Sequence, residues 1–128
     1  SVAKEIYRHE EPFERPALVL CGGEAVVNVR GNGRGGPNME IAASFALNLG
    51  ETEAAIACMA SDGEDGSTTA AGAYADNATC GRADEKGLEV KRFLENNDTL
   101  TLFERLDDLI VTGSTGTNVN SFWLFYVD

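Results

Sequence analysis

The sequence predicts a single α/β domain in which helices flank a layered, mixed β-sheet. Short apolar runs at Ala17–Cys21 and Ala54–Ala60 are typical of strands buried on both faces. Between them, Ile41, Phe45 and Leu49 recur at the spacing of one helix face. Strands that alternate with helices predict a layered sheet, and 128 residues is the length of one domain.

The first part of the chain predicts a lead-in followed by two strands and a helix. Residues 1–16 are polar and charged and contain two prolines, so we expect an extended lead-in before a domain at 17–128. Ala25–Arg30 alternates enough to form a second strand, antiparallel to the first because the connection is short, which makes the sheet mixed. The helix is expected to begin with Asn38 as its N-cap and to end at Gly50.

The second part predicts three short helices and a final strand. Cys80–Lys86 and Leu88–Leu94 have helical patterns, and a third helix follows, capped by Asp98 or by Thr99. Ala70–Ala75 fits a short strand or a helix of small residues equally well. Phe122–Val127 is predicted as a strand suited to the edge of the sheet.

Composition and charge exclude several classes of protein. The net charge of −11 argues against a nucleic-acid partner. Apolar runs of 18 residues are absent, so we expect no membrane span, and the start has no signal-peptide pattern. The three cysteines are widely spaced and odd in number, which favours free thiols in the cytoplasm. One histidine cannot support a histidine-rich zinc site, and the pattern of a Ser-His-Asp triad is not visible.

Most glycines fall in four loops, and each loop directly follows an apolar, strand-like run. The loops read GGE, GNGRGGPN, SDGEDG and TGSTGTN. Ligands of open α/β sheets bind outside the carboxyl ends of the strands. If the preceding strands run in compatible directions, the four loops converge on one rim. Plain turns are the alternative for any one loop taken alone.

The second loop predicts an anion site. Gly33, Gly35 and Gly36 free the backbone to aim N–H groups at an anion. The predicted helix N-terminus at Asn38 adds favourable dipoles. Arg34 can pair with two oxygens of a carboxylate or phosphate, although a solvated surface arginine is the alternative.

The other loops supply carboxylates, hydroxyls and an amide. Glu24, Asp62 and Asp65 suit magnesium or the acceptance of a hydroxyl proton. The alternative for the two aspartates is that they cap turns or helices. Thr117 and Asn118 offer groups for a polar ligand, or they shape the turn into the last strand.

Two familiar nucleotide motifs can be checked directly. The P-loop pattern is absent, because no Gly-Lys is followed by Ser or Thr. Gly31, Gly33 and Gly36 match the dinucleotide pattern G-x-G-x-x-G. Asp62 lies about 30 residues after Gly31, whereas the fingerprint expects its acid after roughly 20 residues. The match to a nicotinamide site is therefore weak.

Three motifs together resemble the MOFRL domain, the carboxyl-terminal part of glycerate 2-kinases, which are often labelled hydroxypyruvate reductases. They are ALVLCGGEAVVNVRGNGRGGPNMEIAASFAL, ASDGEDGSTTAAGAYAD and DDLIVTGSTGTNVN, and the resemblance spans residues 17 to 127. Many members carry arginine where this chain has Pro37, and proline there fits the entry to a helix.

The resemblance implies a function and a role for each motif. Glycerate 2-kinases use ATP and Mg²⁺ to phosphorylate D-glycerate at its 2-hydroxyl, in a cleft between this domain and a larger amino-terminal Rossmann-like domain that this sequence lacks. By position, Arg34, Asp62 and Glu24 would be catalytic, and Asp62 and Asp65 would hold the metal. The nucleotide or substrate would contact the residues Gly33, Gly35, Gly36, Asn38, Thr117 and Asn118. The isolated chain is then expected to be inactive, and its exposed apolar surface favours a homodimer.

Two other functions remain open at this point. The reductase label suggests an NAD(P)-dependent hydroxypyruvate reductase domain. A non-catalytic interaction module with the same fold is the second alternative.

Overall fold

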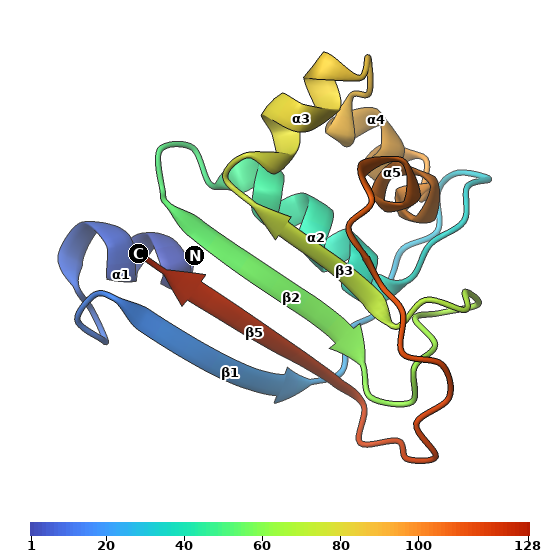
Figure 1. The fold of residues 1–128 in the computed structure, drawn as a ribbon, viewed down its shortest axis with the longest axis horizontal. Coiled ribbons are helices and arrows are strands. Elements are labelled where there is room, and N and C mark those ends of the chain that lie inside the picture. Colours follow the sequence, from blue (N-terminus) through green and yellow to red (C-terminus); the bar gives the residue numbers. More distant parts are fainter.

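A computed structural model describes all 128 residues and shows a five-stranded sheet in the order β1-β5-β2-β3-β4, with five helices (Figure 1). The strands are β1 (Ala17–Gly23), β2 (Ala54–Ala60), β3 (Gly72–Asp76), β4 (Leu109–Ile110) and β5 (Ser121–Val127). The helices are α1 (Val2–His9), α2 (Pro37–Asn48), α3 (Thr79–Glu85), α4 (Val90–Glu95) and α5 (Thr99–Leu106).

Every pairing in the sheet is antiparallel, and this decides where the loops lie. β1 and β2 each pair with β5, and β3 pairs with β2 and β4. Alternate strands of an antiparallel sheet run in the same direction, so β1, β2 and β4 all end at one edge; the arrowheads of β1 and β2 point the same way in Figure 1. The α/β class is confirmed, but the sheet is antiparallel throughout rather than mixed.

The predicted strand at Ala25–Arg30 is wrong, and with it the predicted pairing to β1. These residues form an irregular strap, defined here as residues 24–35. The Asn97 side chain holds it: Oδ1 accepts hydrogen bonds from the backbone N–H groups of Arg30 (2.6 Å) and Gly31 (3.0 Å), and Nδ2 donates to the carbonyl of Asn28 (3.2 Å). Residues 25–30 do show the alternating pattern of a strand, but their backbone hydrogen-bonds to the Asn97 side chain and not to a neighbouring strand.

The final strand is central rather than an edge strand. β5 lies between β1 and β2, with Leu124 opposite Leu20 on one side and Ala57 on the other. Its last apolar residue, Val127, is completely buried. This apolar run therefore lies inside the sheet, where a strand has neighbours on both sides.

The sheet buries only one face. Cys58 and Phe125 point into the core together with residues of α2. On the opposite face, Leu18 and Leu20 are 66% and 68% exposed. The prediction that these strands are buried on both faces is therefore wrong for β1 and also for β2, whose outward residues are only half-buried, because a continuous apolar run does not reveal whether a second layer is present.

The lead-in is helical rather than extended. α1 spans Val2–His9, and its Ala3 and Ile6 are buried in the main core against the sheet. A spacing of three residues places these two side chains on one helix face. The two prolines restrict only the segment after the helix, at Pro12 and Pro16, so residues 1–16 are not extended along their whole length.

The remaining elements follow the predictions closely. β2, α3, α4 and α5 lie within two residues of their expected bounds, and the undecided segment Ala70–Ala75 contributes strand β3. α4 and α5 both pack on α2, and α5 also contacts the short strand β4. The three cysteines are free thiols. None of the helices combines the length and apolar character that a membrane span requires.

A matched pair of leucines tests this one-sided burial. Leu102 of α5 has no exposed surface, whereas Leu20 of β1 is 68% exposed. We expect Leu102→Ala to lower the free energy of unfolding by about 2–5 kcal/mol. Leu20→Ala should cost about 0.5 kcal/mol or less. Urea unfolding followed by fluorescence of the single tryptophan measures both, and equal losses would show that the outer face is buried in solution.

Candidate functional site

The loops that follow β1, β2 and β4 meet at one edge of the sheet. Gly63, in the loop after β2, has a φ of +90°, and a side chain there would collide with the carbonyl of Gly113 in the loop after β4. The amide of Thr115 donates to the carbonyl of Asp62 (3.4 Å). Two of the glycine-rich loops are therefore in direct contact, as the predicted rim requires.

An acidic hollow opens between these loops, with a volume of about 170 Å³. Its lining combines the predicted residues of three loops with several neighbours. Among the residues that line it are Glu24, Asn38, Asp62, Glu64, Asp65, Asn118 and Ser121. The structure thus brings together five predicted site residues that lie up to 94 positions apart in the sequence.

A second hollow adjoins the first, and we call it the arginine hollow. Its volume is about 380 Å³ and it contains the predicted residues Gly33, Arg34, Gly35 and Gly36. Pro37 and Gly66 line both hollows. The further lining residues include Glu40, Ser67 and Asn97, which the sequence analysis did not single out as site residues.

Asp65 caps α2 from the neighbouring loop. Its Oδ1 accepts hydrogen bonds from the backbone N–H of Asn38 (3.0 Å) and from the Asn38 side chain (3.1 Å), and Oδ2 accepts from the N–H of Met39 (2.8 Å). A side chain at Gly36 would occupy the space of Asp65, so glycine is required where the two loops cross. Asp65 has no exposed surface, and both its oxygens already serve the helix.

This cap changes the predicted anion site at the helix N-terminus. The N-cap is Gly36 rather than Asn38, and Pro37 is the first helical residue and has no N–H. The Asp65 carboxylate accepts hydrogen bonds from the next two backbone N–H groups, those of Asn38 and Met39. The N-terminal charge of α2 is therefore balanced by an internal carboxylate, and no free amide of its first turn points at a ligand.

Asn38 is a buried connector. Its Oδ1 accepts from the indole N–H of Trp123 (2.8 Å), and Nδ2 donates to Ser121 Oγ (2.9 Å) as well as to Asp65. All its side-chain groups are used within the protein. Sequence reasoning missed Trp123 and Ser121, although their two-residue spacing at the start of β5 places both on the face of the sheet that α2 covers.

Free donors remain in the glycine loop. Gly33 N–H donates to the carbonyl of Asn96 (3.0 Å), and Arg34 N–H donates to Asp98 Oδ1 (3.2 Å). The N–H groups of Gly35 and Gly36 have no hydrogen-bond partner in the chain. The Arg34 guanidinium takes part in none of the four ion pairs of the protein.

Two carboxyl groups that line the hollows, those of Asp65 and Glu40, have raised pKa values. Burial raises the pKa of Asp65, and the hydrogen bonds from Asn38 and Met39 oppose that shift. Burial also raises the pKa of Glu40; the hydrogen bond from Asn97 Nδ2 (2.5 Å) opposes it, and the nearby charge of Asp65 adds to it. Both groups hold a proton more tightly than an exposed carboxyl does.

Thr117 is the one predicted site residue outside both hollows. It is exposed in the loop after β4, and its backbone exchanges weak hydrogen bonds with the Thr115 hydroxyl. The carboxylates also do not form a preassembled metal cage, since no three His, Cys, Asp or Glu residues are grouped as metal ligands.

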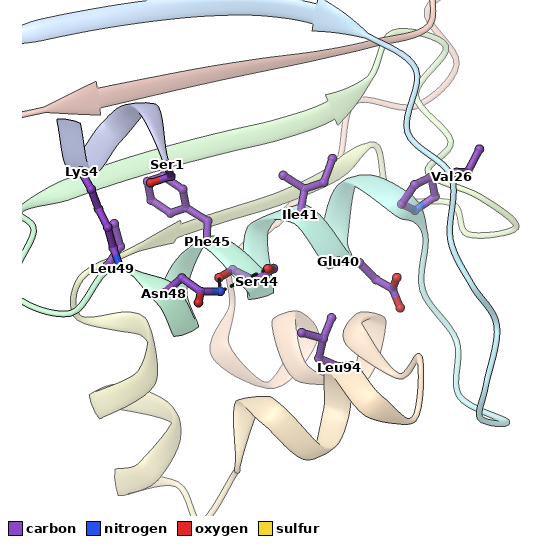
Figure 2. Close-up of a pocket in the computed structure, with 11 residues that line it drawn as sticks. Ser1, Lys4, Val26, Glu40, Ile41, Ser44, Phe45, Asn48, Leu49 and Leu94 are labelled. Carbon is purple, nitrogen blue, oxygen red and sulfur yellow. Dashed lines mark hydrogen bonds between the residues drawn. The ribbon is translucent and has the colours of Figure 1, made fainter. Parts of the chain in front are cut away.

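A larger cavity lies elsewhere, along α2 between α1 and α4, with a volume of about 650 Å³. In Figure 2, Ile41 and Phe45 point from α2 toward the sheet, whereas Glu40 points to the opposite side. Its polar lining residues include Glu40, Ser44 and Asn48, which all come from α2. None of the site residues that the sequence predicted lines this cavity.

A model of the MOFRL family matches residues 17–121, and the chain belongs to this family. The chain is homologous to the MOFRL region of glycerate 2-kinases. It is 42% identical over 121 residues to the D-glycerate 2-kinase of Thermotoga maritima, and 37% identical over 120 residues to the human glycerate kinase.

Solved structures share the fold. The crystal structure of the glycerate kinase from Thermotoga maritima superposes with a TM-score of 0.94 at 37% identity, covering 99% of this chain and 31% of that one. A protein of Pyrococcus horikoshii OT3 superposes with a TM-score of 0.91 at 38% identity, covering 98% of this chain and 29% of that one. The chain therefore spans less than a third of the length of these relatives.

Two aspartates in one loop test the capping role. Asp65→Ala leaves the N–H groups of Asn38 and Met39 without an acceptor, and we expect a loss of about 2–4 kcal/mol in the free energy of unfolding. Asp62→Ala is the matched control, because the Asp62 carboxylate accepts only the neighbouring Glu64 N–H (2.9 Å), and its loss should cost about 1 kcal/mol or less. If both variants lose the same amount, Asp65 does not hold the helix.

The raised pKa of Glu40 predicts how stability changes with pH. Because the pKa is higher in the folded than in the unfolded protein, the stabilisation from protonated Glu40 is complete below its ordinary value of 4.5 and is lost as the pH rises through the folded-state pKa. Glu40→Gln cannot ionise and keeps an acceptor for Asn97. Its stability relative to the wild type should increase between pH 5 and pH 7.5 in urea unfolding. A relative decrease would mean that the pKa is lowered instead.

Proposed function

We propose that this chain forms one wall of the active site of a glycerate 2-kinase, which transfers a phosphoryl group from ATP to the 2-hydroxyl of D-glycerate. The observation that carries the proposal is that Asp62 and Asn118 line one hollow and Arg34 lines the hollow that adjoins it. The kinship with glycerate 2-kinases supports it. Catalysis of phosphoryl transfer consists largely of positioning and charge neutralisation, and these residues are suited to both tasks.

The acidic hollow suits magnesium. Mg²⁺ prefers oxygen ligands, keeps several waters, and in kinases binds one or two carboxylates together with the nucleotide phosphates. Asp62 and Glu24 both line the hollow and would be such carboxylates, whereas the oxygens of Asp65 are committed to α2. When bound, the metal neutralises charge on the transferring phosphates. We therefore assign the metal to Asp62 and give Asp65 a positioning role.

The arginine hollow suits an anionic oxygen. The Arg34 guanidinium has no partner in the chain, and the amides of Gly35 and Gly36 are free, so these three donors are available to stabilise charge. Asn118 lines the acidic hollow and offers an amide. In this proposal Thr117 stays a looser candidate, because it faces solvent.

The site needs a second wall. Both hollows are open to water, and phosphoryl transfer to an alcohol requires that water be excluded. Relatives of this chain are more than three times as long as the segment they share with it. We propose that a larger, Rossmann-like domain closes the cleft and that the enzyme works in the cytoplasm. Self-association of the chain stays a prediction.

The geometry disfavours a dinucleotide site at the G-x-G-x-x-G match. A pyrophosphate on such a motif is bound by free amides at the helix N-terminus. Here Asp65 occupies those amides, and Gly33 N–H is bound to Asn96. The first turn of α2 therefore offers no amide to a pyrophosphate, and only the N–H groups of Gly35 and Gly36 before it stay free.

Kinetics test the proposal. In a protein that joins this chain to the larger domain, we expect Asp62→Asn and Arg34→Ala each to lower the rate of ATP-dependent phosphorylation of D-glycerate by about 10² or more. Glu104→Gln, an exposed change on α5, is the control and should leave the rate unchanged. The 128-residue chain alone should show no turnover.

Three results would contradict it. Full activity of both site variants would indicate a non-catalytic module. Steady turnover by the isolated chain would show that no second wall is needed. Oxidation of NADH by hydroxypyruvate, followed at 340 nm, would indicate a reductase.

A further inference from the structure

The two adjoining hollows differ in charge, and that difference decides which reactant each can hold. The acidic hollow carries Glu24, Asp62 and Glu64. The arginine hollow carries one cation, Arg34, and one carboxylate, Glu40. A polyphosphate with several negative charges would need metal to enter the first and would meet Glu40 in the second.

Arg34 is held in place by α5. Its backbone N–H donates to Asp98 Oδ1 (3.2 Å), and its carbonyl accepts from the N–H of Leu100 (2.8 Å). The arginine side chain thus starts from a fixed point, while its guanidinium is unpaired. One cation beside the two free amides of Gly35 and Gly36 matches a singly charged carboxylate.

Acceptors for hydroxyl groups lie in the same hollow. Glu40 is oriented by Asn97, which donates to Glu40 Oε1, and the Asn97 side chain is itself fixed by the strap. The Ser67 hydroxyl lines the hollow and makes no hydrogen bond within the chain. A carboxylate beside an anion site is unfavourable for a polyphosphate, but it is suited to accept a hydrogen bond from an alcohol.

We infer that the arginine hollow binds the α-hydroxy acid, with Arg34 and the amides of Gly35 and Gly36 on its carboxylate and with Glu40 and Ser67 on its hydroxyl groups. The metal–nucleotide phosphates lie in the acidic hollow across Pro37 and Gly66. The inference rests on the proposed kinase function and assigns its two substrates to separate compartments.

Steady-state kinetics of the protein that carries both domains test this assignment. Arg34→Ala should raise the KM for D-glycerate by about tenfold or more, the effect of losing a charged hydrogen bond, and leave the KM for ATP within about twofold. Glu40→Gln and Ser67→Ala should raise the same KM by smaller factors. Asp62→Asn should raise the KM for magnesium–ATP instead. A rise in the KM for ATP with Arg34→Ala and Ser67→Ala, and none for glycerate, overturns the inference.

Binding to the 128-residue chain separates this inference from the proposed function. In amide NMR spectra, D-glycerate should shift the resonances of Gly35, Gly36, Gly66 and Ser67, and propionate, which lacks the hydroxyl groups, should shift them less at equal concentration. Shifts confined to Glu24, Asp62 and Asn118 overturn the inference. If D-glycerate binds in the arginine hollow but the two-domain protein transfers no phosphoryl group, only the proposed function fails.

Discussion

The contact between Asp65 and the first turn of α2 is the one on which the rest of the site depends. It joins the loop after β2 to the helix that follows the glycine loop, and it fixes where the two hollows meet. The contact is possible only because Gly36 leaves room for the carboxylate and because Pro37 needs no acceptor. Asn38 in turn forms hydrogen bonds with Ser121 and Trp123 of β5, so the start of α2 is also fixed to the sheet.

A second set of contacts fixes the other side of the site. Asn97, in a left-handed conformation with φ of +54°, saturates its side chain with the strap and with Glu40. Asp98 and Leu100 then clamp the backbone at Arg34. An irregular segment without a strand partner is thereby held by the junction between α4 and α5. The Arg34 guanidinium and the amides of Gly35 and Gly36 stay free because they have no acceptor within the chain.

The domain is built on one layer of helices over one face of a sheet, and this places its chemistry at an edge rather than in a buried pocket. Alternate strands of the antiparallel sheet end together, so three loops gather there without any parallel pairing. The hollows between them are shallow and wet. In the proposed function, such an edge holds charged reactants and a second domain excludes water from them.

The sequence by itself determined the α/β class, most of the helices and strands, and the loops that supply the site. Periodicity and glycine placement are local signals, and they predicted β2 and α3 closely and grouped Arg34, Asp62 and Asn118 into candidate loops. Only the tertiary structure decided which segments pair with or hydrogen-bond to one another. Ala25–Arg30 lost its strand because Asn97, far along the chain, binds its backbone, and Asp65 became a cap because α2 comes within hydrogen-bond distance of it. β5 is an interior strand because it pairs with β1 on one side and with β2 on the other, and its own apolar run does not reveal these two partners. Such long-range pairings leave no trace in the pattern of either segment alone.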